Sequence, residues 1–349
     1  MTDVFAQTFA ARHWYRRTTL STLLLPVAWG FFLISFLRRL LYRAGLLSSV
    51  RLPVPVIIVG NLTVGGTGKT PLVIWIADML RKAGMSPGIV LRGYAGAGSG
   101  VLEVSTGAIA ALVGDEAVLL AERSACPVWV GANRVASAQA LLRMHPECNV
   151  LICDDGLQHY RLARDLEIAV EDARGHGNGR LLPSGPMREP GNRAVEVTVV
   201  NAPESHSLPL RNGRVLRMTL VPGQLRRVGN HATGPTQVAL DSLKGKRLHA
   251  VAGIGNPERF FEMLGAMGLD AKGHAFPDHH AYKTADLEFP DCDAVLMTEK
   301  DAVKCRLLEA GALIAVGVSA DPDPGLAELI LDVVSRHPAR VTRRKGQFA

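Results

Sequence analysis

Residues 54–71 have the sequence VPVIIVGNLTVGGTGKTP, in which an apolar run leads through a glycine-rich turn into Gly-Lys-Thr. A buried strand that enters a helix through such a turn is typical of a nucleotide-phosphate cradle, because glycines let backbone N–H groups close around phosphate oxygens. Lys69 is expected to supply a positive charge for the β- and γ-phosphates, and Thr70 a hydroxyl for Mg²⁺. The stretch therefore predicts ATP and Mg²⁺ as cofactors, with phosphoryl transfer or hydrolysis as the chemistry.

The glycine-rich turn departs from the standard P-loop pattern. Thr63 stands where that pattern has its first glycine, so the match is to the shorter form Gly-Gly-Thr-Gly-Lys-Thr. The alternative is an ordinary strand-to-helix turn whose glycines only allow a positive φ. Apolar residues at helical spacing over 71–80 favour the cradle. The predicted nucleotide-binding residues of this stretch are Thr63, Gly65, Gly66, Thr67, Gly68, Lys69, Thr70 and Pro71.

A second apolar run, residues 149–153, ends in two acids, Asp154 and Asp155. P-loop enzymes use an acid at the carboxyl end of such a strand to hold Mg²⁺ or its water shell. Taken alone, an apolar run that ends in Asp usually just begins a turn. In a chain that also carries the cradle, we predict that both acids share Mg²⁺ with Thr70, and that Lys69 and Asp155 are catalytic.

Composition and charge narrow the partners. The chain has 349 residues, 48% of them apolar, which suits two globular domains. Its five cysteines are scattered and form no Cys-x-x-Cys, which favours a reducing compartment over zinc or a disulfide framework. Residues 1–51 contribute +6 and residues 336–345 contribute +5 to the net charge of +7, so the body carries −4. An acidic body argues against nucleic acid as a partner, and basic ends beside an apolar helix favour an anionic membrane surface.

An apolar helix is predicted at residues 20–37, with arginine pairs on both sides. Eighteen helical residues span about 27 Å, slightly less than the roughly 30 Å hydrocarbon core of a bilayer. No small-residue cleavage site follows, which argues against a removed signal peptide. We favour an anchor that lies in or dips into the cytoplasmic leaflet, with a true span and a buried core helix as alternatives.

Strands and helices alternate along the rest of the chain, which predicts an α/β fold. The expected fold is a P-loop NTPase-like parallel sheet domain with an N-terminal membrane helix, joined by a β-hairpin linker to a smaller second α/β domain. The predicted segments are the anchor 1–45, the P-loop domain 46–212, a two-stranded linker 213–230, the second domain 231–335 and a basic tail 336–349. The predicted strands are 54–59, 87–91, 126–130, 149–153, 167–171, 195–200, 247–252, 294–298 and 313–318, and the predicted helices 69–83, 114–124, 132–145, 156–162, 258–265 and 324–336.

Eight blocks of residues together resemble one family. The blocks are 60–71, Arg92-Gly93-Tyr94, Gly114-Asp115-Glu116, 154–159, 182–190, 253–261, 276–282 and 298–304. In this order, within residues 15–335, they resemble the tetraacyldisaccharide 4′-kinase family, the lipid A 4′-kinases of Gram-negative bacteria. Three positions depart from the family's usual pattern, Leu91, Ala117 and Tyr160, and none of them removes a group that the chemistry needs.

The resemblance implies an activity and a location. It implies transfer of the γ-phosphate of ATP to the 4′-hydroxyl of a membrane-embedded, tetraacylated glucosamine disaccharide 1-phosphate, a lipid A disaccharide precursor. The product would be lipid IVA, made at the cytoplasmic leaflet of the inner membrane. The acidic body, the basic apolar anchor and the scattered cysteines agree with that expectation.

The resemblance also assigns an acceptor-side base. A sugar hydroxyl is a poor nucleophile, and its attack is helped by a group that accepts its proton. Asp115 is the predicted base, with an ordinary helix N-cap as the alternative. His279 is expected to orient and polarise that carboxylate. A surface pair formed by His279 and His280 is the alternative, and the family block aligns His279 better than His280.

Four further residues are assigned with the same family in view. Glu189 is expected to join the metal or nucleotide network, and Arg188 to stabilise charge on the transferring phosphate. A loop salt bridge is the alternative for both. Arg92 and Arg134 are assigned to the lipid's 1-phosphate, with solvated arginines as the alternative.

The main alternative function is a membrane-associated partitioning or trafficking ATPase that acts as a switch. The P-loop of such ATPases carries a signature lysine, and Val64 stands at that position here. A kinase needs an acceptor-side base such as Asp115, and it transfers phosphate to a lipid rather than only to water.

Overall fold

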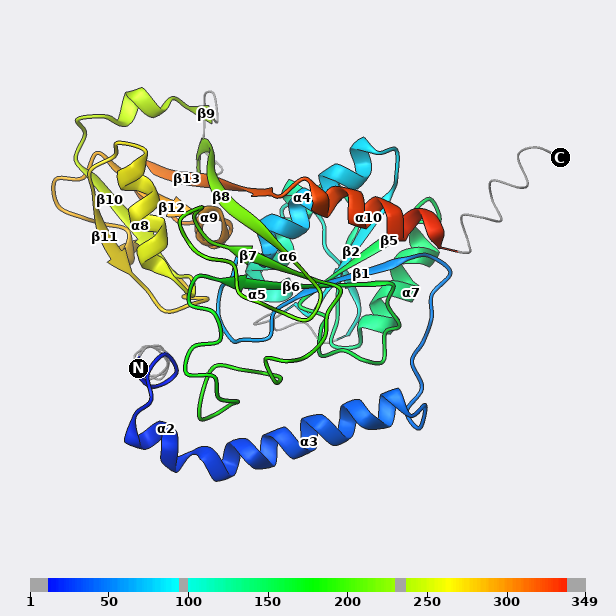
Figure 1. The fold of residues 1–349 in the computed structure, drawn as a ribbon. Helices are drawn as coiled ribbons and strands as arrows, with labels where there is room; N and C mark the ends of the chain where they lie inside the picture. Colours follow the sequence, from blue (N-terminus) through cyan, green and yellow to red (C-terminus); the bar gives the residue numbers. More distant parts are fainter. Residues whose placement is uncertain (1–11, 94–99, 230–236, 338–349) are drawn as a thin grey trace.

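The computed structural model describes residues 12–93, 100–229 and 237–337. The first eleven residues of the predicted anchor and residues 338–349 of the predicted basic tail lie outside these ranges. One large, mostly parallel sheet passes through both halves of the described chain (Figure 1). Its strand order is β11-β10-β12-β13-β8-β7-β6-β1-β5-β2-β4-β3, and β9 pairs with β8. The predicted α/β fold class is confirmed.

The elements alternate along the chain as expected. The N-terminal half contains β1 (Val56–Gly60), α4 (Lys69–Lys82), β2 (Pro87–Leu91), β3 (Leu102–Glu103), α5 (Ala110–Val113), α6 (Asp115–Arg123), β4 (Val128–Val130), α7 (Arg134–Met144), β5 (Val150–Asp154), β6 (Leu166–Asp172) and β7 (Val197–Asn201). The C-terminal half contains β8 (Arg214–Arg227), β9 (Gln237–Val238), β10 (Leu248–Ala252), α8 (Pro257–Ala266), β11 (Ala271–Ala275), β12 (Ala294–Thr298), α9 (Glu299–Cys305), β13 (Leu313–Pro322) and α10 (Gly325–Arg336), with short 3-10 turns at Leu240–Leu243 and Thr284–Asp286.

The central strands are buried on both faces, as a parallel sheet requires. Along β1, Ile57 and Val59 pack into the core beneath α4, whereas Val56 and Ile58 pack into a second core on the opposite face. All four side chains are 0–1% exposed. Burial of each side chain stabilises the fold by about 1.5–3 kcal/mol relative to an exposed position. The apolar run therefore fixes β1 in the centre of the sheet, and with it the start of the glycine-rich turn.

Residues 213–229 differ from the prediction, because they form no hairpin. They form one long strand, β8, which begins parallel to β7 and continues antiparallel to β13. The Pro222-Gly223 pair, which predicted the turn, lies where the pairing with β13 shifts register. A proline has no N–H to donate, and an irregular position in a ladder tolerates it. The sheet therefore continues through β8 from one half to the other, and α10 then packs onto the core of the N-terminal half.

The helix predicted at 156–162 is also wrong, since these residues form turns. The guanidinium of Arg164 donates hydrogen bonds to the carbonyl oxygens of Leu157, His159 and Leu162, at distances of 3.1, 2.6 and 3.1 Å. A side chain that satisfies these carbonyls removes the need for helical backbone bonds. The segment after Asp155 is thus a fixed, arginine-braced turn.

The predicted apolar helix is present, but it is broken at Leu24 into α2 (Thr19–Leu23) and α3 (Leu25–Arg43). Within the described residues, α3 is the one helix long and apolar enough to cross a membrane. Most of it is exposed and it runs along the outside of the body (Figure 1), so the buried core helix is ruled out. The α2–α3 segment touches the body at both ends. In α2, the hydroxyl of Ser21 accepts a hydrogen bond from Arg180 at 3.2 Å, and in α3 the ring of Tyr42 lies 5.8 Å from that of Tyr160.

Candidate active site

The glycine-rich turn connects β1 to the first residue of α4, Lys69. Gly65 and Gly68 have φ values of 118° and 96°, which side-chain-bearing residues rarely adopt. Gly68 is the N-cap of α4, so the free N–H groups and the positive end of the helix dipole face this loop. The amide of Asn61 donates to the carbonyl of Gly65 at 3.1 Å and closes the loop. Such a loop can hold a phosphate.

Two neighbouring segments hold the loop in place. The side-chain amide of Asn201, at the end of β7, donates to the carbonyl of Thr67 at 3.0 Å. The N–H of Val64 donates to the carbonyl of Pro186 at 2.8 Å, within the 182–190 block. The hydroxyl of Thr67 is buried and has no hydrogen-bond partner. A buried polar atom without a partner marks a place where a ligand is expected.

The two acids predicted for the metal, Asp154 and Asp155, lie at the carboxyl end of β5, the strand that pairs with β1. Asp155 Oδ1 is 3.7 Å from Lys69 Nζ, and both of its oxygens are 2.9 Å from Arg188 Nη1. Burial opposes ionisation of Asp155, but these two cations hold its pKa below the ordinary value. At Asp154, burial and the charge of Glu116 raise the pKa to about 7.

The residues present fit a divalent cation. Asp154 is 1% exposed, and its Oδ1 is buried without a hydrogen-bond partner. No group of three or more His, Cys, Asp or Glu side chains in the described ranges has metal-binding geometry. Mg²⁺ in nucleotide sites is bound through only one or two carboxylates and completes its shell with phosphates and water. Thr70, Asp154 and Asp155 are therefore enough if a nucleotide supplies the rest.

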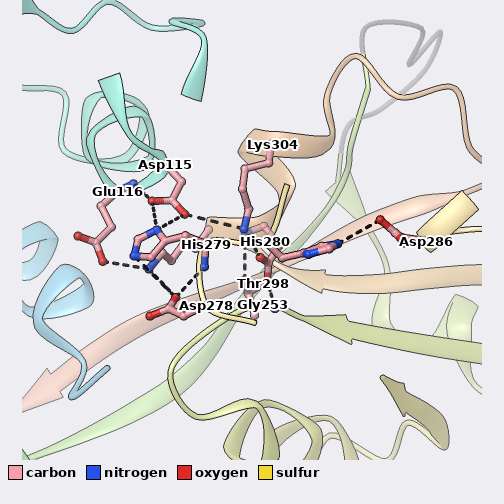
Figure 2. A network of polar contacts seen from close by, with 11 residues as sticks. Asp115, Glu116, Gly253, Asp278, His279, His280, Asp286, Thr298 and Lys304 are labelled. Carbon is pink, nitrogen blue, oxygen red and sulfur yellow. Dashed lines mark hydrogen bonds and ion pairs between the residues drawn. The ribbon is translucent and has the colours of Figure 1, made fainter. Parts of the chain in front are cut away.

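The structure brings the predicted base and its histidine together. Asp115 is the first residue of α6, and its Oδ1 and Oδ2 lie 3.1 and 3.0 Å from Nδ1 of His279 (Figure 2). Gly114 is the N-cap of α6, and Asp115 Oδ1, at the first helical position, also accepts the backbone N–H of Glu116 at 2.8 Å. His280 points away from this pair and contacts Asp286 at 3.1 Å (Figure 2).

Two lysines of α9, Lys300 and Lys304, lie beside the Asp115–His279 pair. Lys300 Nζ is 3.1 Å from Glu116 Oε1 and 3.2 Å from Asp278 Oδ1. Lys304 Nζ is 3.8 Å from Asp115 Oδ2 and 2.7 Å from Asp301 Oδ1. Lys304 and Asn201 are not among the predicted residues. Lys304 belongs to the 298–304 block and Asn201 directly follows the predicted strand 195–200, but only their distances to Asp115 and Thr67 indicate what they do.

The charges in this network favour an ionised Asp115. Burial raises its pKa, but the hydrogen bond from His279 and the nearby charge of Lys300 bring the pKa below the ordinary value. Burial lowers the pKa of His279, and the hydrogen bond to Asp115 raises it above the ordinary value. The contact therefore favours the ionised form of Asp115 and the protonated form of His279 together.

The four remaining predicted residues occupy two kinds of environment. Arg188 is paired with Asp155, as described above. Glu189 is 4% exposed and is contacted by Arg193 at 2.7 Å and by the hydroxyl of Tyr160 at 2.6 Å. Glu189 is thus part of a buried ion pair, although its Oε1 has no partner. Arg92 and Arg134 line the same cleft as the P-loop.

One cleft of about 1880 Å³ joins these parts. Its lining includes Phe31, Ser35 and Arg38 of α3 on one side, the glycine-rich loop in the middle, and residues of the C-terminal half on the other. Most predicted site residues line it, namely Gly65, Gly66, Thr67, Gly68, Lys69, Thr70, Pro71, Arg92, Arg134, Asp154, Asp155, Arg188, Glu189 and His279. Thr63 and Asp115 are buried and do not line it, so His279 is the member of the pair that faces the cleft.

A parallel sheet whose first strand enters a helix through this loop, with an acid pair on the adjacent strand, defines a P-loop NTPase-like α/β protein. The comparison with protein families is more specific. The family model LpxK, described as Tetraacyldisaccharide-1-P 4′-kinase, matches residues 20–335, and the chain belongs to this family.

Individual relatives agree with the family match. The tetraacyldisaccharide 4′-kinase of Azoarcus sp. (strain BH72) is 48% identical over 325 residues, which cover 93% of this chain and 94% of the relative. That of Methylobacillus flagellatus is 48% identical over 333 residues, 95% of each chain. The crystal structure of "apo" form LpxK from Aquifex aeolicus in complex with ATP has a TM-score of 0.77 at 30% identity, covering 90% of this chain and all of that one.

Proposed function

We propose that this chain is an ATP-dependent lipid kinase. It transfers the γ-phosphate of ATP to the 4′-hydroxyl of a tetraacylated glucosamine disaccharide 1-phosphate and so forms lipid IVA. One observation carries the proposal: a single cleft contains both a phosphate-binding loop and the Asp115–His279 pair. The relatives are named tetraacyldisaccharide 4′-kinases, and these names support a tetraacylated disaccharide as the substrate.

The donor side is built around the loop. Backbone N–H groups of the loop and the start of α4 bind the β-phosphate, and Lys69 contacts the β- and γ-phosphates. Thr70, Asp154 and Asp155 would hold Mg²⁺, which neutralises charge on the phosphates when bound. A bound phosphate competes with Asp155 for Lys69 and Arg188, which frees both cations for the nucleotide. Glu189 holds this region through Arg193.

The acceptor side supplies the proton acceptor. The 4′-oxygen attacks the γ-phosphorus while its bond to hydrogen breaks, and the proton passes to the Asp115–His279 pair. The bond between the γ-phosphorus and the bridging oxygen breaks, and ADP leaves with that oxygen. Asp115 is the base and His279 fixes its orientation.

A lipid-borne acceptor accounts for the exposure of α3. The face of α3 that includes Phe31, Ser35 and Arg38 lines the cleft, while its other faces expose Trp29 and Ile34, which are 70% and 69% exposed. Such an arrangement suits a helix in the cytoplasmic leaflet of the inner membrane, next to a lipid-borne acceptor. Arg92 and Arg134 bind the 1-phosphate of that acceptor, where an arginine fork matches phosphate oxygens.

The ATPase switch is the disfavoured alternative, because the family match is to a kinase. A transfer assay tests the choice. The purified protein is incubated with γ-labelled ATP, Mg²⁺ and the detergent-solubilised lipid disaccharide. Labelled lipid is the expected result. Label that appears only in inorganic phosphate, at the same rate with and without lipid, would support the switch instead.

A further inference from the structure

The first turn of α8 lies against the phosphate loop, although it belongs to the other half of the chain. The turn before α8 contains Gly255, and a side-chain carbon placed on Gly255 would lie 2.7 Å from the backbone nitrogen of Gly66. Only glycine allows an approach this close. Arg259, which follows in the first turn of α8, lines the same cleft as the loop.

A buried asparagine fixes the position of Arg259. Nη2 of Arg259 donates to Oδ1 of Asn201 at 2.5 Å, and the amide nitrogen of Asn201 donates to the carbonyl of Thr67 at 3.0 Å. Asn201 is 1% exposed and cannot turn away without losing both bonds. The guanidinium of Arg259 is therefore held one side chain away from the loop.

Arg259 has no carboxylate in direct contact. Asn201, its hydrogen-bond partner, is neutral, and Arg259 forms no ion pair with any residue of the described ranges. Arg174 shows the contrast, because it also contacts the loop, at the carbonyl of Gly66, but is paired with Asp172 at 2.6 Å. Burial lowers the pKa of the Arg259 guanidinium below the ordinary value, and the more distant charges of Asp172 and Glu262 offset this effect only in part.

Holding a cation without a direct ion pair in a partly buried place is costly, and a bound anion lowers that cost. The anion that belongs in this cleft is the phosphate chain of the nucleotide. A guanidinium suits it, because its planar donors match phosphate oxygens.

We propose that Arg259 binds phosphate oxygens of ATP in the P-loop, so that α8 of the C-terminal half completes the nucleotide site. This inference rests on the proposed function, since it takes the P-loop to hold ATP. Arg259 is then a nucleotide-binding residue, and its contact favours the arrangement in which Gly255 lies against Gly66.

A purely structural role makes a different prediction. If Arg259 only holds Asn201, then any side chain that donates to Oδ1 of Asn201 will serve. Arg259→Gln keeps a donor but removes the charge, whereas Arg259→Lys keeps the charge. Lys272→Met is a matched control, because it removes an exposed cation from β11 of the same half, outside the cleft.

Equilibrium titration of the full-length, detergent-solubilised protein with Mg²⁺-ATP tests the inference. Loss of a charged hydrogen bond to phosphate should weaken ATP binding by Arg259→Gln roughly 10- to 100-fold, with Arg259→Lys in between and Lys272→Met like the wild type. The KM for lipid should stay unchanged in Arg259→Gln.

Two outcomes would overturn the inference in distinguishable ways. Wild-type affinity in a folded Arg259→Gln contradicts it and leaves the proposed function intact. No ATP binding by the wild type contradicts the proposed function, and the inference with it. Circular dichroism checks folding. If Arg259→Gln does not fold, Arg259→Lys decides alone, and an ATP affinity equal to that of the wild type, instead of the expected weaker binding, counts against a phosphate contact by the guanidinium.

Discussion

Nδ1 of His279, in the loop after β11, lies 3.0 Å from Oδ2 of Asp115, the first residue of α6. The two residues are 164 positions apart, and each half of the chain supplies one of them. The pair therefore exists only when the two halves are in contact. The same holds for the contact between Gly66 and Gly255. The C-terminal half thus completes the Asp115–His279 pair, the proposed acceptor-side base, and also packs against the phosphate loop.

Replacing Asp115 tests its role as the base. We expect Asp115→Ala to lower kcat by about 10²- to 10⁴-fold, the range for removal of a positioned general base. ATP binding should be unchanged, because Asp115 does not line the cleft. Steady-state transfer assays and ATP titration measure the two effects. Normal turnover of Asp115→Ala would show that another group accepts the proton.

Lys304 is expected to tune the base rather than to bind substrate. Removing a cation 3.8 Å from Asp115 takes away one of the charges that lower its pKa. In Lys304→Met, the acid limb of the kcat–pH profile should therefore move to higher pH, with Lys304→Arg close to the wild type. A profile that keeps its shape in Lys304→Met, whatever its height, would refute this role.

The same lowered pKa predicts a direction for stability. A carboxylate whose pKa is lower in the folded state stabilises the fold above its unfolded pKa, and that stability is lost as pH falls through the folded pKa. The Asp115 contribution is thus present above about pH 4 and lost in stronger acid. Asp115→Asn should flatten the loss of unfolding free energy below pH 4, as followed by denaturant titration. An equally steep loss in Asp115→Asn would contradict the assignment.

Gly255 tests the contact between the halves. In Gly255→Ala the new methyl group would clash with the backbone of Gly66, so the halves must separate. We expect a higher KM for ATP and a lower kcat together. Gly265→Ala is the control, because nothing lies within 4 Å of that position in α8. It should leave both constants unchanged and stabilise the helix by about 0.5–1 kcal/mol. Equal kinetics for the two variants would argue against the contact.

Exposed apolar side chains of α2 and α3 test the proposed membrane contact without disturbing the fold. Changing Leu23, Trp29 and Ile34 to serine removes side chains that are 69–70% exposed. We expect the protein to partition from anionic liposomes into the aqueous phase, since the apolar area available for burial falls. Leu210→Ser, at a body residue that is 97% exposed, is the control. Undiminished liposome binding of the triple variant would place the membrane contact elsewhere.

The sequence predicted the parts that depend on local pattern. The run before Gly60 and the helix after Gly68 follow from apolar spacing, and the Asp115–His279 pair followed from the family blocks. The linker was mispredicted, because Pro222-Gly223 favours a turn, whereas pairing with the distant β13 decides that region. Arg259 could not be assigned from sequence, since its importance lies in a distance to Asn201 and in the absence of an ion pair with any of the described residues.

The most direct test of lipid 4′-phosphorylation with Asp115 as the base is the position of the transferred phosphate. Lipid product made by the wild type and by Asp115→Ala is examined by phosphorus–proton correlation NMR. We expect a new phosphomonoester on the 4′-oxygen from the wild type and almost none from the variant. A new phosphate at another place, for example on the existing 1-phosphate to form a diphosphate, would contradict the proposed 4′-kinase activity. Equal amounts of product from both proteins would contradict the role of Asp115.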